Sequence, residues 1–262
     1  MLAFTLLLRE LRDLCGEKGS FMIALLCSVQ AEAESLLAKT AVTKTTPFGA
    51  KTVIAGRLAD RDILLCVGGM GKVNAAHAAT LLLTHFSPEA LLIFGVGGAY
   101  PSSGAAVGDI ALAKEEVAGD EGVLTLDGFK DTEYIGIPLF KTATSTIYTT
   151  YPAPENLLQR SRKTLAAIRH DGAVHVGPFV TLSTCTGTTM RAQELEDRYH
   201  GLCENMEGAA AAQVALCHDM PWLEVRGISN IVEDRDLKKW NIPKAAESAQ
   251  KAVMHILEGW GG

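Results

Sequence analysis

Positively charged residues are in the minority in this 262-residue sequence: 24 lysines and arginines stand against 30 aspartates and glutamates, and the formal charge is −6. A protein that binds nucleic acid by neutralising its phosphates needs the opposite excess. Aromatic residues are also scarce, at 6 % of the chain, whereas there are 25 glycines. The composition therefore argues against a nucleic-acid partner, and it favours a site built from tight backbone turns over an aromatic binding face.

The sequence contains no Cys-x-x-Cys pair, and its seven histidines show no H-x-x-x-H or H-E-x-x-H spacing. Such spacings are typical of redox and zinc sites. The six cysteines are scattered, mostly in apolar stretches: Cys15, Cys27, Cys66, Cys185, Cys203 and Cys217. We therefore expect reduced thiols in a cytoplasmic protein that has no bound metal and needs no cofactor.

Long hydrophobic runs are missing as well. The apolar segment Met1 to Leu8 leads directly into charged residues, and it is far shorter than the roughly 20 residues that span a bilayer. It also lacks the basic start and the small-residue cleavage site of a signal peptide. We expect no membrane association, a helical or poorly ordered extension over residues 1–20, and a folded domain over residues 21–262.

The remaining sequence alternates buried-strand patterns with helical patterns. Strands are expected near residues 21–27, 52–55, 62–67, 90–94, 109–113, 178–183 and 222–228, and helices over 31–39, 72–86, 154–170, from 189, 207–217 and 245–257. Residues 121–151 have the character of long loops. This alternation predicts an α/β fold: a single three-layer α/β/α domain around a mixed, mainly parallel sheet.

Two glycine clusters follow expected strands. Gly69-Met70-Gly71-Lys72-Val73 lacks the G-x-x-x-x-G-K-[ST] spacing of a phosphate-binding P-loop, and Gly95-Val96-Gly97-Gly98 lacks the G-x-G-x-x-G spacing of a dinucleotide site. Each cluster can serve as an ordinary tight turn. Alternatively, glycines at strand ends let backbone amides approach a ligand.

Six stretches of the sequence, between about residues 22 and 258, resemble the motifs of a known family and follow one another in the same order. They are Ile23 to Glu32, Gly69 to Ala76, Phe94 to Ala99, Val107 to Ile110, Asn205 to Ala210 and Val225 to Asn230. In these stretches the chain resembles the nucleoside phosphorylase and hydrolase superfamily, specifically its nucleosidase branch.

Within that branch, the segments Gly97 to Pro101, Glu204 to Glu207 and Ser229 to Val232, with Arg235, Asp236 and Trp240, are most similar to the futalosine hydrolases. The resemblance implies an enzyme that hydrolyses the N-glycosidic bond of futalosine in menaquinone biosynthesis and releases hypoxanthine. It also implies a small-molecule nucleoside as the partner and a homodimer or higher homo-oligomer.

The resemblance assigns roles to two carboxylates. Glu32 falls on the glutamate that activates the attacking water, with Glu34 as the alternative if the alignment shifts by two residues. Glu207 falls on the carboxylate that binds the ribose hydroxyls, and Met206 packs beneath the sugar. The alternative for Glu207 is a carboxylate that favours a helix N-terminus electrostatically.

Asn230 differs from the aspartate that adenine-specific nucleosidases have at this position. Its amide donates to purine N7 or O6 and offers one carbonyl acceptor, but it cannot supply a proton. We therefore predict that Asn230, the second catalytic residue beside Glu32, selects hypoxanthine over adenine, and that Arg226 and Ser229 help to orient it. Protonation of the leaving base is then left to solvent or to hydrogen bonding at O6 and N7.

The resemblance also places Val96, Gly97 and Thr186 against the substrate. Val96 stands where phosphorylases commonly have a serine, and no arginine occurs between Asp62 and Gly108, so water is the expected nucleophile. An arginine from a neighbouring subunit, or Arg57 or Arg61, is the route by which phosphate could still enter. The loop 184–187 lacks the stacking aromatic of adenine-specific members.

Trp240 and Arg235 are expected either to shape the pocket for the non-ribose end of the substrate or to be a packing tryptophan with a solvated arginine. The alternatives to a futalosine hydrolase are three. One is a nucleosidase that releases adenine from methylthioadenosine, S-adenosylhomocysteine or aminodeoxyfutalosine. The others are a phosphorylase and a nucleoside-binding protein without catalysis.

Overall fold

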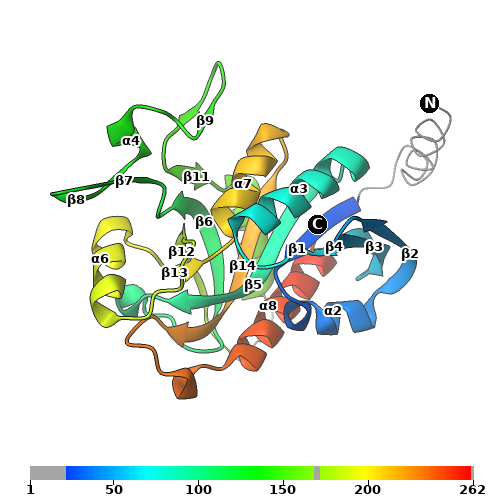
Figure 1. Ribbon diagram of the computed structural model, residues 1–262. Helices are drawn as coiled ribbons and strands as arrows, with labels where there is room; N and C mark the ends of the chain where they lie inside the picture. Colours follow the sequence, from blue (N-terminus) through cyan, green and yellow to red (C-terminus); the bar gives the residue numbers. More distant parts are fainter. Residues whose placement is uncertain (1–21, 168–171, 261–262) are drawn as a thin grey trace.

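The computed structural model describes residues 22–167 and 172–260, so the extension expected over residues 1–20 lies outside the described residues. A ten-stranded sheet runs through the molecule in the order β11-β6-β12-β13-β5-β1-β4-β3-β2, with β14 paired to both β5 and β6 (Figure 1). Its strands are β1 (Met22–Cys27), β2 (Ala41–Phe48), β3 (Lys51–Leu58), β4 (Arg61–Val67), β5 (Ala90–Ala99), β6 (Ile110–Ala118), β11 (Thr150–Pro152), β12 (Val174–Thr181), β13 (Cys203–Asn205) and β14 (Trp222–Ile231).

The sheet is mixed, as expected, but it is not mainly parallel. Among the described residues, five of its strand pairs are parallel and five are antiparallel. The strands β5, β14, β6, β12 and β13 pair in a closed ring, because β13 returns antiparallel to β5 and β14 runs antiparallel to β6. One half of the sheet is therefore barrel-like.

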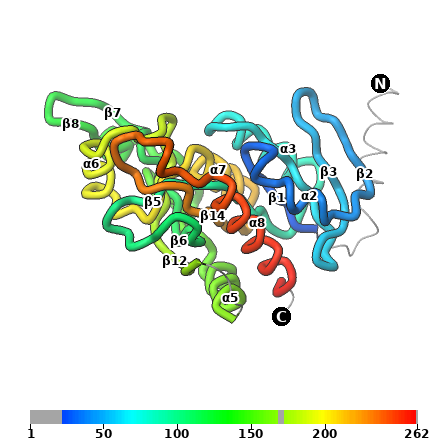
Figure 2. The backbone as a smooth tube through the Cα atoms, turned by 90° about the horizontal axis from the view of Figure 1, so that it is seen from below, coloured from blue at the N-terminus to red at the C-terminus, as the bar shows by residue number. Residues whose placement is uncertain are grey.

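Helices cover both faces of this sheet. On one face α3 (Lys72–Phe86) packs against α7 (Gly208–Cys217) through buried alanines, which let the two backbones approach closely. On the other face α5 (Glu155–Ala166) and α8 (Ile242–Glu258) lie together (Figure 2). The remaining helices are α2 (Glu34–Lys39), α4 (Thr132–Ile135) and α6 (Thr189–Tyr199), with 3-10 turns η1 (Gln30–Glu32), η2 (Pro101–Ser103) and η3 (Leu237–Lys239).

Three local expectations are corrected. Strand β5 does not stop at Gly95 but continues through the glycine cluster to Ala99, because β13 and β14 pair with it there on either side. The expected helix over 31–39 begins as the 3-10 turn η1. The segment 121–151 is not simply loop: it contains α4, β11 and two hairpin pairs, β7 (Gly122–Thr125) with β8 (Gly128–Asp131) and β9 (Phe140–Lys141) with β10 (Thr146–Ile147).

Four adjacent parallel strands, β4, β1, β5 and β14, bring their carboxyl ends to one edge of the sheet. The first glycine cluster follows β4 there, and Gly69 and Gly71 both have φ near +93°, a conformation that glycine adopts readily. In the part of the chain that the structure describes, no helix has both the length and the apolar character needed to cross a membrane. The five described cysteines are free thiols.

Candidate active site

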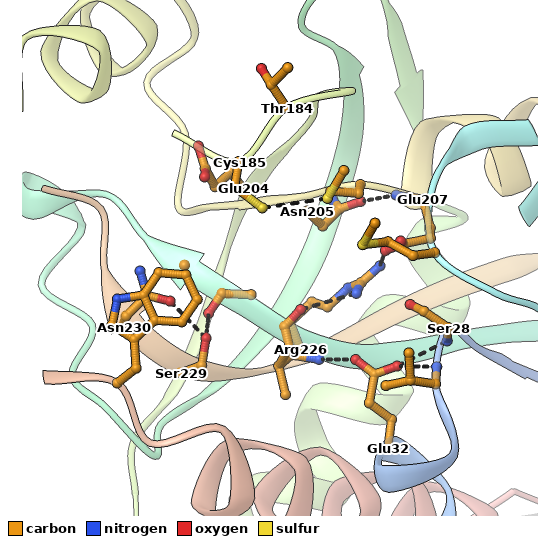
Figure 3. Close-up of a pocket in the computed structure, with 17 residues that line it drawn as sticks. Ser28, Glu32, Thr184, Cys185, Glu204, Asn205, Glu207, Arg226, Ser229 and Asn230 are labelled. Carbon is orange, nitrogen blue, oxygen red and sulfur yellow. Dashed lines mark hydrogen bonds and ion pairs between the residues drawn. The ribbon is translucent and has the colours of Figure 1, made fainter. Parts of the chain in front are cut away.

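A pocket of about 740 Å³, its open mouth included, lies at this edge of the sheet (Figure 3). It is lined by Ser28, Val29, Glu32, Met70, Val96, Gly97, Gly98, Thr184, Cys185, Glu204, Asn205, Met206, Glu207, Arg226, Ser229, Asn230 and Trp240. Every site residue predicted from the sequence lines this pocket except Thr186. In Figure 3, Glu32, Glu207 and Arg226 lie at one end, and Glu204, Ser229 and Asn230 lie at the other.

Glu32 is held at the pocket wall by backbone amides. It lies in η1, directly beyond β1, and is 3 % exposed. One carboxylate oxygen accepts the N–H of Ser28 at 2.9 Å and of Val29 at 3.1 Å, and the other accepts the N–H of Val96 at 2.8 Å. A Cβ on Gly95 would lie 2.4 Å from this carboxylate, so a glycine is needed there. Glu34, the alternative, is exposed and does not line the pocket.

Glu207 directly precedes α7, but its side chain makes no hydrogen bond that caps the helix. One oxygen accepts the backbone N–H of Gly71 at 2.9 Å, and the other accepts from Arg226 at 3.2 Å. Asn205 occupies the helix start instead, because its Oδ1 accepts the N–H groups of Glu207 at 2.8 Å and Gly208 at 2.7 Å. The side chain of Glu207 is thereby free to project into the pocket.

Arg226 links the carboxylates of this end and is 1 % exposed. Its guanidinium donates to Glu207, to Glu224 at 2.7 Å and to the carbonyl of Val96 at 3.1 Å. Burial alone would lower the pKa of Arg226, but the charges of Glu224, Glu207 and Glu32 raise it above its ordinary value. Arg226 is thus held as a cation, and each of its three guanidinium nitrogens donates one hydrogen bond.

A second carboxyl group lies behind Glu224. Glu116 is fully buried, and burial, followed by the charge and the hydrogen bond of Glu224, raises its pKa well above the ordinary value. It accepts from Thr181 at 2.6 Å and from the Asn205 amide at 2.8 Å. The protonated form of Glu116 is thereby favoured, and the carboxylate that accepts from Arg226 is that of Glu224.

At the other end of the pocket a register shift in β14, between Ile228 and Asn230, turns two polar side chains toward the ligand space. The hydroxyl of Ser229 donates to Asn230 Oδ1 at 2.8 Å and lies 3.1 Å from the Gly97 carbonyl. The Asn230 Nδ2 donates to the carbonyl of Ile231 at 3.1 Å. The bond from Ser229 fixes the orientation of the Asn230 amide, and one N–H remains available to the pocket.

The loop 184–187 behaves differently from the prediction. Thr184 and Cys185 line the pocket, but Thr186 does not. Thr186 is buried, and its backbone N–H donates to the carboxylate of Glu204 at 2.9 Å. Sequence reasoning assigned no role to Glu204, although the residue stands in the motif that carries the resemblance.

Two further predictions concern cations and the pocket mouth. Among the described residues Arg226 is the only lysine or arginine that lines the pocket. Arg57 pairs with Asp60, and Arg61 borders a separate surface hollow.

Trp240 lines the pocket, and the Arg235 guanidinium stacks on it at 4.6 Å from the ring centre. In the described part of the chain no group of three or more potential ligand side chains is placed to hold a metal ion.

Comparisons with known proteins identify the family of the chain. The profile of the Phosphorylase superfamily matches residues 22–258. The 5′-methylthioadenosine/S-adenosylhomocysteine nucleosidase of Maridesulfovibrio salexigens is 30 % identical over 241 residues, which cover 90 % of this chain and 98 % of that protein. The futalosine hydrolase of Streptomyces coelicolor is 34 % identical over 205 residues, covering 75 % and 80 %.

Solved structures share the fold. The S-adenosylhomocysteine nucleosidase of Streptococcus pyogenes, in complex with 5-methylthiotubericidin, superposes with a TM-score of 0.78 at 24 % identity and covers 93 % of this chain and 98 % of its own. The futalosine hydrolase of Helicobacter pylori superposes with a TM-score of 0.79 at 17 % identity, covering 92 % and 99 %.

Proposed function

The chain belongs to the phosphorylase superfamily, and on this basis we propose that it hydrolyses the N-glycosidic bond of futalosine, a 6-oxopurine nucleoside, and releases hypoxanthine. Its relatives include both futalosine hydrolases and adenine-releasing nucleosidases at about 30 % identity. They have in common the cleavage of a nucleoside. The choice of base therefore rests on the geometry of this pocket.

The end that contains Glu207 fits the ribose. Cleavage passes through a ribosyl cation-like transition state, which a nearby carboxylate stabilises. The two oxygens of Glu207 are fixed by Gly71 and Arg226, and their remaining lone pairs can accept from the ribose hydroxyls. Met206, the neighbouring lining residue, packs beneath the sugar.

Glu32 fits the role of general base for the attacking water. An ionised carboxylate has about four lone-pair sites, and three of these are occupied by backbone N–H groups. The remaining one can accept a proton from water held in the pocket. Because the carboxylate is anchored at both oxygens, it cannot swing away from that water.

Asn230 carries the proposal for the base. Its oxygen accepts from Ser229, so the amide presents N–H to the purine. This donor suits the O6 of hypoxanthine, whereas the 6-amino group of adenine would oppose one donor with another. The same N–H strengthens its bond as negative charge builds on the departing base, which assists a leaving group that Asn230 cannot protonate.

The test is to incubate the protein with futalosine and, separately, with methylthioadenosine, in the presence and absence of phosphate. Free bases and sugar products are then measured by chromatography. We expect hypoxanthine and the free sugar product from futalosine at a rate that phosphate does not change. Adenine release without hypoxanthine would refute the choice of substrate. A sugar phosphate product would refute hydrolysis.

An adenine-releasing nucleosidase is the second candidate. It is supported by the Maridesulfovibrio salexigens nucleosidase, which is 30 % identical over 90 % of this chain, the same identity and share as the Acidothermus cellulolyticus futalosine hydrolase. The methylthioadenosine arm of the same assay tests it directly.

A further inference from the structure

The side chain of Arg235 contacts two residues that line the pocket. Its guanidinium stacks on the indole of Trp240, at 4.6 Å from the ring centre. It also reaches Cys185: burial and the charge of Glu204 raise the pKa of this thiol, and the charge and the hydrogen bond of Arg235 act in the opposite direction. The backbone N–H of Arg235 donates to the carbonyl of Gly187 at 3.2 Å. Arg235 is therefore held at the pocket wall by Trp240 and by the loop that contains Cys185.

Arg235 is a cation without an anionic partner among the described residues, although carboxylates adjoin it in the sequence. These carboxylates are engaged elsewhere. Glu233 forms an ion pair with Lys239 at 2.6 Å. Asp234 and Asp236 each accept a backbone N–H group, at 2.8 Å and 3.1 Å respectively. The guanidinium of Arg235 thus keeps N–H donors for an anionic group of a ligand.

The other charged side chains at the pocket wall are unsuited to an anionic ligand. Glu32, Glu204 and Glu207 line the pocket, so most of its ionisable groups are acidic. The guanidinium of Arg226 already donates to two carboxylates and to a carbonyl. An anion that enters the pocket gains little from these side chains, because like charges repel it and the buried cation is engaged. Arg235 is the cation that can offset this cost.

The place of Arg235 relative to the sugar follows from its neighbour Cys185. The sulfur of Cys185 lies 3.5 Å from the sulfur of Met206, the residue that the proposed function puts beneath the ribose. The guanidinium therefore lies one side chain beyond the sugar position. Trp240 adds a flat apolar surface to the pocket wall at the same place. An arm that leaves the ribose there meets an apolar surface first and a cation at its end.

We propose that Arg235 is a specificity-determining residue that binds a carboxylate at the end of an arm on the 5′ carbon of the substrate, while Trp240 packs along the arm. This inference rests on the proposed function and names a second feature of its substrate. Futalosine carries an aromatic carboxylate on that arm, whereas methylthioadenosine carries a neutral methylthio group. A planar guanidinium donates two parallel N–H bonds to a carboxylate. The pocket thus selects the acidic arm separately from the base.

A structural role is the competing explanation, in which Arg235 orders Trp240 by stacking and is otherwise solvated. The two roles differ in what they do to the choice of substrate. Loss of stacking weakens the cleavage of acidic and neutral substrates alike, whereas loss of the carboxylate contact weakens the acidic substrate alone. The carboxylate contact also weakens with added salt, because both charges lie near solvent.

The experiment compares futalosine with its carboxamide analogue, in which a neutral CONH₂ of similar size replaces the carboxylate. The value of kcat/KM is measured for both, with the full chain and with Arg235→Met. We expect the wild type to favour the acid about 10-fold, mainly through KM, and the variant to lose this preference. Lys238→Met removes a positive charge from the same segment, outside the pocket. It is the matched control and should retain the preference.

Equal kcat/KM for the acid and the amide in the wild type, or a preference that survives in Arg235→Met, would overturn the inference. The proposed function would stand, because hypoxanthine is still released. A wild-type protein that releases no hypoxanthine from futalosine would overturn the proposed function itself. If Arg235→Met does not fold, the wild-type preference is measured from about 0.05 M to about 0.5 M salt, where screening should reduce it. A preference that salt does not change would overturn the inference.

Discussion

At one end of the pocket the charged side chains form ion pairs and hydrogen bonds within the protein. At the other end, polar side chains keep hydrogen-bonding capacity for a ligand. Glu207 and Glu224 both pair with Arg226, and Glu32 accepts three backbone N–H groups. Glu204 accepts from Thr186 and Tyr100 without any ion pair among the described residues, and Asn230 uses one of its two N–H groups on the carbonyl of Ile231. The end that contains Glu32, Glu207 and Arg226, the rigid end, is ordered before the substrate binds and suits a reaction centre. The end that contains Glu204 and Asn230, the selecting end, gains hydrogen bonds only from a matching base and therefore suits selection of the base.

The largest effect is expected from Glu32→Gln, which removes the base at the rigid end. The turnover number for futalosine should fall by about 10³-fold, within the range of lost general-base catalysis. The dissociation constant of hypoxanthine, which occupies the other end, should change only a few-fold. Steady-state kinetics and calorimetry measure the two quantities. Full activity in Glu32→Gln together with loss in Glu34→Gln would show that the alignment is shifted.

Arg226→Met tests how far the rigid end depends on its single cation. The variant leaves the carboxylates of Glu207 and Glu224 buried and uncompensated, so the free energy of unfolding should fall by about 3–5 kcal/mol. Urea unfolding followed by circular dichroism measures this. The matched control is Arg235→Met, an exposed cation stacked on Trp240, which should change the free energy by less than about 1 kcal/mol. Similar losses in both variants would contradict the account of Arg226.

Asn230→Asp changes the selecting end alone. A protonated aspartate donates to N7 and accepts from a 6-amino group, so the ratio of kcat/KM for futalosine to that for methylthioadenosine should fall by about 10–100-fold. Rates of base release measured with each nucleoside give this ratio. An unchanged ratio would mean that Asn230 does not choose the base.

The smallest effect at acidic pH is expected from Glu116→Gln, and this effect should grow as pH rises. Burial and Glu224 raise the pKa of Glu116, so the native state retains a proton that the unfolded chain releases above about pH 4.5. The contribution of Glu116 to the wild-type free energy of unfolding should therefore decline as pH rises above that value. Glu116→Gln lacks this decline and should differ from wild type by less than about 1 kcal/mol near the acidic end. Identical pH profiles for urea unfolding would show that Glu116 is ionised in the folded protein.

Local sequence patterns predicted much of the fold. Helix α3 spans the expected residues, and α7 begins one residue late, because apolar periodicity and glycine breaks define both. Strand β2 was missed because it is a mostly exposed edge strand without an apolar pattern. Strand β13 is only three residues long, and its pairing with β5 and β12 is set by residues distant in sequence.

Some residues of the candidate site were likewise predicted from the sequence, and others were not. Glu32, Glu207 and Asn230 were predicted through a resemblance that covers contiguous motifs, and the structure brings them into one pocket. Thr186 was also predicted to contact the substrate; it does not line the pocket, and its N–H binds Glu204, which does. The arrangement around Glu204 could not be predicted, because it depends on strand register at Gly98 and on a loop contact, neither of which leaves a local pattern.

The central claim is that the selecting end accepts a 6-oxopurine. Its most direct test is a competition assay in which futalosine and methylthioadenosine are present at equal concentration and the initial rates of hypoxanthine and adenine release are measured together. Selection of a 6-oxopurine predicts that hypoxanthine release exceeds adenine release by at least about 10-fold. Equal rates, or an excess of adenine, would contradict it.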